Sequence, residues 1–197
     1  ADWPQMAREA RSLDREYWEF AKGYWNLSAL LVASGHSSVI VELYDRARPP
    51  LESGELEWKR VARPMTIIAL RDAGRVAEAN RLLSLYQAST LRLPTRGQFG
   101  DEREFDLAII AALNGRHEQA LQGLDRLSRR NPAMIEINPA MSLRHHPAFA
   151  PMADRPGFAE VDERLRAFVN AARRQSGLAP ISLEAWISDP KTLLTKN

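Results

Sequence analysis

The amino-acid sequence predicts an all-α protein built from repeated helical hairpins. Three observations favour this fold class. Apolar residues recur at spacings of three and four along the chain, which is the period of an amphipathic helix. Runs that alternate apolar and polar residues, as strands do, are scarce. A turn pattern centred on glycine occurs three times at nearly constant spacing, which is typical of repeat proteins.

The composition is that of a globular chain of one domain with appendages. The chain has 197 residues, of which 45% are hydrophobic and 26% charged, close to the average for soluble domains. The formal net charge is only +2, and acidic residues stand beside the densest basic cluster, from Arg164 to Arg174. This mixture predicts a solvated helix surface and no nucleic-acid binding. No apolar run reaches the roughly 18 residues of a membrane span.

The repeated pattern joins two helices through a glycine. Gly35, Gly74 and Gly115 lie 39 and 41 residues apart, each between a small or short polar residue and a basic or imidazole residue. Glycine ends a helix readily because it adopts the left-handed conformation without a Cβ clash. An isoleucine or alanine follows each glycine by five residues, where a small or medium side chain lets two helices cross closely. The pattern therefore predicts three αα-hairpins.

The boundaries of the elements follow from proline, glycine and capping residues. Residues 1–15 are expected to form a lead-in helix and residues 16–132 the three hairpins. Two connections are assigned between hairpins, Arg46–Glu55 and Thr90–Glu102. Within the second, Gly97–Glu102 is interpreted as a flexible loop in which Asp101 offers a helix N-cap.

The C-terminal third is predicted to be a proline-rich connection followed by one helix. Residues 133–178 contain these two parts, and the helix is expected from about Pro156 to Gln175, ending at Gly177. Its apolar stripe consists of Phe158, Val161, Leu165, Phe168 and Val169. Residues 179–197 are expected to be a loose tail with one short turn at Ser182–Trp186.

The hairpins resemble the tetratricopeptide repeat family, whose motif orders a small residue, glycine, alanine and an aromatic or leucine residue in this way. The third copy matches at Leu107, Ala108, Gly115, Ala120, Leu124 and Pro132, and the first at Tyr24, Leu27, Ser28, Leu31, Gly35 and Tyr44. The second departs at Arg63 and Thr66. Family repeats are about 34 residues long, so these copies are longer. HEAT or armadillo repeats have the longer period but match less well inside the hairpin. The resemblance implies a right-handed superhelix of about three repeats.

The segment after the third hairpin resembles the C-terminal caps of some bacterial regulators that contain such repeats. The resemblance rests on His146–Phe168, with its His-Pro-Ala-Phe and Arg-Pro-Gly-Phe groups. A terminal hairpin in a repeat array has one uncovered apolar face. A capping helix is therefore expected to cover the third hairpin.

The resemblance also implies a concave groove lined by the first helix of each hairpin. Its residues are placed by their distance from the turn glycines: Lys22, Trp25, Ala29, Val32, Pro64, Ile68, Arg71, Glu102, Phe105 and Ile109. Such a groove is apolar with a few charges at its edges, which suits an extended peptide or a partner helix. It lacks the dense basic set with which family members bind a C-terminal carboxylate. The alternative is that Trp25, Ile68 and Phe105 pack within the protein.

No residue pattern predicts catalysis, a cofactor or a metal site. The chain has no cysteine, which excludes disulfides, thiolate ligands and cysteine nucleophiles. His145 and His146 are adjacent and so do not share a helix face. No His-Glu-x-x-His or Gly-x-Ser-x-Gly motif is present. The chain is therefore not expected to be an enzyme or to bind a cofactor.

These observations favour a non-catalytic interaction or scaffold module that binds a protein or peptide partner, as part of a bacterial regulatory or envelope protein. The chain begins at Ala1, which fits a processed mature protein or a trimmed fragment, and a periplasmic location is slightly favoured over a cytoplasmic one. Two alternatives stay open. One is a small-molecule-sensing effector domain, and the other is a homo-oligomeric structural element that associates with itself.

Overall fold

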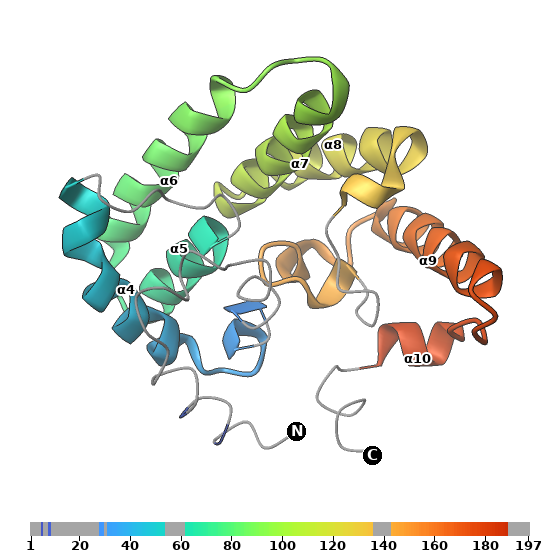
Figure 1. Cartoon of the computed structure of the whole chain (residues 1–197), viewed down its shortest axis with the longest axis horizontal. Helices are drawn as coiled ribbons and strands as arrows, with labels where there is room; N and C mark the ends of the chain where they lie inside the picture. Colours follow the sequence, from blue (N-terminus) through green and yellow to red (C-terminus); the bar gives the residue numbers. More distant parts are fainter. Residues whose placement is uncertain are drawn as a thin grey trace. The chain divides into compact units, whose positions relative to one another are not determined.

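A computed structural model of the chain describes residues 28–53 apart from residue 30, 62–135 and 143–188, together with Gln5 and Arg8. These residues form helices and turns and contain no β-strand (Figure 1). The predicted all-α class is therefore confirmed for the described chain. The predicted lead-in helix lies outside it, except for Gln5 and Arg8, which are helical. The chain divides into two compact units, Ala1–Tyr86 and Gln87–Asn197.

Unit 1 is held together by an apolar interface between two helices. These are α4 (Ser37–Ser53) and α5 (Ala62–Asp72), which pack against each other. A third helix, α6 (Val76–Leu91), follows α5 and continues across the boundary between the units. The most buried side chains of α4 and α5 are Val39, Ile40, Leu43, Met65, Ile67 and Leu70. Burial of each large apolar side chain contributes about 1.5–3 kcal/mol, so this interface stabilises the packing of α4 on α5.

Polar contacts fix how the α5–α6 turn sits on α4. The Oγ of Ser37 donates a hydrogen bond of 2.6 Å to Asp72 at the end of α5. The guanidinium of Arg75 donates to both carboxylate oxygens of Asp45 at 2.7 Å, and also to Glu78. Two parallel N–H donors match a carboxylate well. Arg75 therefore ties the turn both to α4 and to the start of α6.

Unit 2 begins with a helical hairpin and ends with a helix that covers it. Helix α7 (Gly97–Leu113) packs along α8 (His117–Arg130), and α9 (Phe158–Gln175) packs against α8 (Figure 1). Three short 3-10 turns lie between α8 and α9: η1 (Pro132–Met134), η2 (Leu143–His145) and η3 (Ala150–Met152). Pro132 in η1 and Pro151 in η3 are unfavourable in the interior of an α-helix, and the described residues of this segment form no α-helix.

The three glycine turns share one hydrogen-bond pattern. Gly35, Gly74 and Gly115 have φ values of 82, 74 and 71°. In each turn the glycine amide donates to the carbonyl three residues earlier, and the next amide donates to the carbonyl five residues earlier, at 2.7–3.0 Å. This is the Schellman motif, which satisfies the last carbonyls of a helix. Each of these three glycines thus ends a helix, as the sequence predicts.

The segment after α8 covers the α7–α8 hairpin. Phe149 and Phe158 are completely buried, and the centroid of the Phe149 ring lies 6.2 Å from that of Phe105 on α7. From α9, the Nε of Arg164 donates to Ser128 on α8 at 3.1 Å. These contacts cover one side of the α7–α8 hairpin. Gly177 ends α9 with a φ of 72°.

Two predicted connections are helical in the structure. Helix α4 continues through Pro49 and Pro50 to Ser53, so most of the connection expected at 46–55 is helix. A proline removes its own helical hydrogen bond but does not prevent the residues after it from being helical. The flexible loop expected at 97–102 is likewise the start of α7, whose N-cap residue is Arg96 and not Asp101.

A close backbone approach at the start of α7 explains why the glycine at position 100 does not form a flexible loop. A Cβ on Gly100 would lie only 2.7 Å from the carbonyl carbon of Thr95. Glycine at this position therefore permits a close approach of two backbone segments, and its presence does not indicate a mobile loop. Asp101 lies inside the helix, where it accepts a hydrogen bond from Asn131.

The chain after α9 is held in place by side-chain hydrogen bonds, in contrast to the expected loose tail. The amide of Ile181 donates to Asn170 Oδ1 at 2.6 Å, and Asn170 Nδ2 donates back to the Ile181 carbonyl at 2.9 Å. Helix α10 (Leu183–Ile187) follows and buries Trp186, whose exposed fraction is 1%. Residues 189–197 lie outside the described residues. No described helix has the length and apolar character needed to cross a membrane.

Candidate functional site

A half-open groove of about 470 Å³ lies between α7 and α8 in unit 2. Its volume is in the range of ligand-binding pockets. The lining residues come from the turn before α7, from one face of α7 and from one face of α8. They are Thr95, Arg96, Gly97, Gly100, Asp101, Arg103, Glu104, Leu107, Ala108, Gln119, Gly123, Arg126 and Arg130.

Small residues let the two helices approach closely beneath the groove. A Cβ on Gly123 would lie 3.4 Å from the Cβ of Ala108. The α8 lining residues recur at spacings of three and four, which places them along one side of that helix. Longer side chains at neighbouring positions, such as Glu104 and Arg126, then stand at the edges of the groove.

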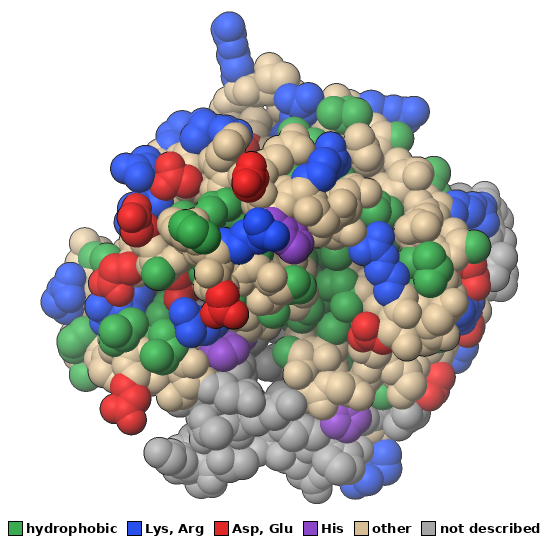
Figure 2. Space-filling model, turned by 180° about the vertical axis from the view of Figure 1, so that it is seen from behind, with side chains coloured by type: hydrophobic (Ala, Val, Ile, Leu, Met, Phe, Trp, Pro, Cys, Tyr) green, Lys and Arg blue, Asp and Glu red, His purple; other side chains and the backbone are tan. Residues whose placement is uncertain are grey.

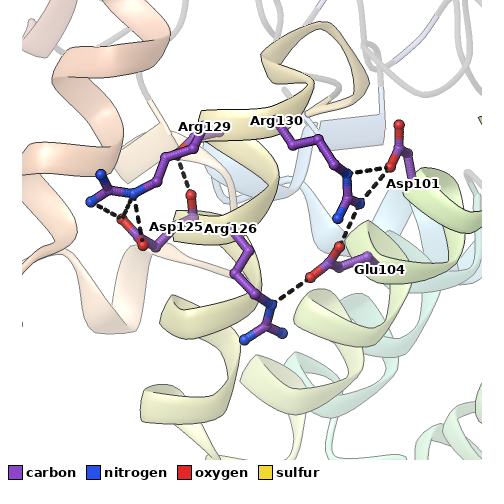
Figure 3. Close-up of polar contacts among 7 residues, drawn as sticks. Asp101, Glu104, Asp125, Arg126, Arg129 and Arg130 are labelled. Carbon is purple, nitrogen blue, oxygen red and sulfur yellow. Dashed lines mark hydrogen bonds and ion pairs between the residues drawn. The ribbon is translucent and has the colours of Figure 1, made fainter.

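Carboxylates of α7 and arginines of α8 join the two helices. Glu104 accepts a hydrogen bond of 2.8 Å from Arg126 Nε and one of 2.7 Å from Arg130. Asp101 accepts from Arg130 Nε at 3.0 Å and from Asn131 at 2.8 Å. Figure 3 shows Arg130 directed toward both carboxylates, with Arg126 on the other side of Glu104. Both carboxylates of this network, Asp101 and Glu104, are therefore already paired with side chains of the protein itself.

The arginines of the network are far more exposed than its acids. The side chains of Asp101 and Glu104 are 16% and 19% exposed, whereas those of Arg126 and Arg130 are 61% and 54% exposed. Hydrogen bonds from Asn131 and Arg130 hold the pKa of Asp101 below its ordinary value. Hydrogen bonds to Glu104 and Asp101 raise the pKa of Arg130. The charged forms of Asp101 and Arg130 are thus favoured, and the network presents its arginines to solvent.

Two further arginines give the groove an excess of positive charge. Arg96 and Arg103 line the groove, and neither has an acidic partner within ion-pair distance among the described residues. The Nε of Arg103 is buried without a hydrogen-bond partner. The lining therefore contains four arginines against two carboxylates. The first turn of α7, which has no side-chain cap, adds the partial positive charge of a helix N-terminus.

None of the described residues that the sequence assigned to a concave groove lines the α7–α8 groove. Ala29, Val32, Pro64, Phe105 and Ile109 are buried, and Ile68, Arg71 and Glu102 are partly exposed. Lys22 and Trp25 lie outside the described residues. Phe105 packs against Phe149 in unit 2. Glu102 is on α7 but is not among the residues that line the α7–α8 groove.

Sequence reasoning missed most of the α7–α8 groove. Gly123, Arg126 and Arg130 follow one another on a single helix face, and an isolated glycine inside a helical pattern indicates a close packing partner. That signal was available in the sequence. The partner helix face was not, because it depends on how α7 and α8 are rotated against each other.

The adjacent histidines have structural contacts. His146 Nδ1 accepts from the Ala148 amide at 3.2 Å, and its ring centroid lies 4.7 Å from that of Phe149. Burial lowers the pKa of His146 to about 3. His145 Nε2 lies 3.1 Å from the carbonyl oxygen of Ile187 in α10. Within the part of the chain that the structure describes, no three His, Asp or Glu side chains group as metal ligands.

The basic cluster on α9 is largely engaged with the protein itself. Arg164 pairs with Asp125, Arg166 with Glu163 at 2.7 Å, and Arg173 donates to the Ala179 carbonyl at 2.7 Å. Asp162 of the same helix is buried and accepts a hydrogen bond from the Leu143 amide at 2.7 Å. The face seen in Figure 2 carries basic and acidic side chains interspersed.

Comparison of the chain with known protein families, curated proteins and solved structures finds no match.

Proposed function

We propose that the chain is a non-catalytic helical-repeat scaffold that binds a protein or peptide partner. The observation that carries the proposal is the half-open groove between α7 and α8, with its exposed arginines and small-residue floor. The shared Schellman pattern of the three glycine turns supports a tetratricopeptide-like repeat array of the kind found in bacterial regulatory proteins. Such arrays present grooves to extended peptides or partner helices.

The shape of the groove favours a chain segment over a small molecule. Small-molecule pockets bury most of the surface of their ligand, whereas this groove is open along one side. The charges also argue against proton-transfer catalysis, which works best with a pKa near the working pH. Here the hydrogen bonds favour the charged forms of Asp101 and Arg130.

A peptide selection tests the proposal. The whole chain is immobilised and used to select from a phage-displayed library of random dodecapeptides, with an unrelated helical protein as the control surface. We expect a family of related sequences to be enriched on this chain only. A synthetic peptide of that family should bind in solution with a defined stoichiometry by titration calorimetry. If no sequence is enriched over the control surface, the chain is not a peptide-binding scaffold.

A further inference from the structure

We propose that the α7–α8 groove takes an extended, acidic peptide segment. This inference rests on the proposed function and names the chemistry of the partner at that same site. The first argument is charge complementarity. Arg126 and Arg130 neutralise the two carboxylates of the lining, while Arg96 and Arg103 keep no acidic partner among the described residues. The lining therefore has a net positive charge, which attracts ligands of negative charge.

The second argument is length. The lining runs from Gly97 to Ala108 on α7 and over an equal number of residues, from Gln119 to Arg130, on α8. At a rise of roughly 1.5 Å per residue each side is about 16 Å long. An extended chain advances about 3.3 Å per residue, so the groove accommodates about five residues of a peptide.

The third argument is the distribution of the arginines. A single phosphate is held best by donors that converge on one point. In this groove the two arginines without an acidic partner among the described residues, Arg96 before α7 and Arg103 on α7, are seven residues apart, or about two helical turns. A row of spaced cations matches several carboxylates along a chain. Leu107 and Ala108 add an apolar section, which suits an apolar residue between the acidic ones.

The test compares two double variants that change the net charge equally. Arg96→Gln with Arg103→Gln removes the two unpaired arginines of the groove. Arg92→Gln with Arg116→Gln removes two exposed arginines of the same unit that do not line it. The dodecapeptide selection is run on the native chain and on both variants, after circular dichroism has shown equal helix content. The best peptide is then measured by fluorescence polarisation.

We expect the native chain and the Arg92/Arg116 variant to enrich peptides rich in Asp and Glu. The Arg96/Arg103 variant should bind the best of them about tenfold more weakly, since each exposed ion pair contributes up to about 1 kcal/mol and 1.4 kcal/mol is tenfold. If that double variant does not fold, Arg96→Gln alone gives the same comparison, because Arg96 is exposed and precedes α7. About a threefold loss is then expected.

The other outcomes separate this inference from the proposed function. Selected peptides that are not acidic, or that bind the groove variant equally well, overturn the acidic partner but leave peptide binding in place. Displacement of the peptide by sodium phosphate beyond that by sodium chloride of equal ionic strength indicates a phosphate site and also overturns it. Failure to enrich any peptide on any form of the chain overturns both.

Discussion

Two glycines of the α7–α8 hairpin are expected to respond to alanine in opposite directions. Gly115 has a φ of 71°, and a Cβ there would meet nothing within 4 Å, whereas a Cβ on Gly123 would stand 3.4 Å from that of Ala108. We expect Gly115→Ala to lower the free energy of unfolding by about 1 kcal/mol, because alanine is strained in the left-handed region. Gly123→Ala should raise it by about 0.5 kcal/mol through helix propensity, since the new contact is nearly ordinary. Urea unfolding measures both, and a larger loss for Gly123→Ala would contradict this account.

The buried His146 makes a prediction about acid stability. Burial lowers its pKa from 6.5 to about 3 in the folded protein, so the unfolded chain binds more protons between these values. The contribution of neutral His146 to the free energy of unfolding is therefore fully present above pH 6.5. It is lost as the pH decreases toward 3, by about 1.4 kcal/mol per pH unit. Asp101 and Glu163 also have lowered pKa values, but from ordinary values of 3.8 and 4.5. Protonation of these two carboxylates therefore lowers the free energy of unfolding at a lower pH than protonation of His146 does.

The measurement compares native protein with His146→Gln by urea unfolding between pH 5 and 7. Glutamine cannot titrate, so the slope of stability against pH should become flatter below pH 6.5 in the variant. Its absolute stability is not the readout, because the substitution also changes packing against Phe149. Parallel pH profiles for the two proteins would show that His146 does not titrate as its burial requires.

At the scale of elements, α10 is held mainly by one side chain. Trp186 is 1% exposed, whereas Leu183 on the same helix is 54% exposed. We expect Trp186→Ala to lower the free energy of unfolding by about 3 kcal/mol, as large-to-small core changes do. Amide hydrogen exchange should also quicken throughout α10. The matched control Leu183→Ala should change stability by less than about 0.5 kcal/mol. Equal effects of the two variants would mean that α10 is not docked by its tryptophan.

The sequence predicts well those features of the fold that depend on a single residue and its neighbours in the chain. The ends of the hairpin helices depend on a single residue type, glycine in the left-handed region, and so does the end of α9 at Gly177. The docking of residues 178–188 depends instead on a reciprocal pair of hydrogen bonds between Asn170 and Ile181. Neither residue carries a local signal for this contact. A tryptophan at 186 indicates burial but not the surface that buries it.

The α7–α8 groove is only partly predictable from the sequence. Its α8 side is readable, because Gly123 and the arginines at 126 and 130 share one helix face. The α7 side is not readable, because the sequence predicts a loop at 97–102. That loop would place Gly97, Gly100 and Asp101 before the helix that carries Arg103 and Glu104, whereas all five residues belong to α7. Both glycines of that segment suggest mobility, and only the close approach of Gly100 to Thr95 shows their role in a tight turn.

At the scale of the whole molecule, positive and negative side chains nearly cancel. The net charge is +2, and ion pairs such as Arg75–Asp45 and Arg166–Glu163 are at least partly exposed on one partner. Exposed ion pairs contribute about 0–1 kcal/mol each and are screened by salt. The apolar interiors of the two units therefore dominate stability. The uncompensated positive groups of the groove matter to a ligand more than to the fold.

If buried apolar side chains stabilise the fold and arginines attract the ligand, folding and binding should respond differently to salt. Raising sodium chloride from 50 to 500 mM should change the free energy of unfolding by less than about 2 kcal/mol, because screening of exposed pairs is offset by stronger apolar burial. Over the same range the affinity for an acidic peptide should fall by about tenfold or more. Urea unfolding and fluorescence polarisation in the same buffers measure the two responses. A peptide affinity that is unaffected by salt would mean that the arginines of the groove do not attract the ligand. A loss of stability well above 2 kcal/mol would mean that the ion pairs, and not the buried side chains, hold the helices together.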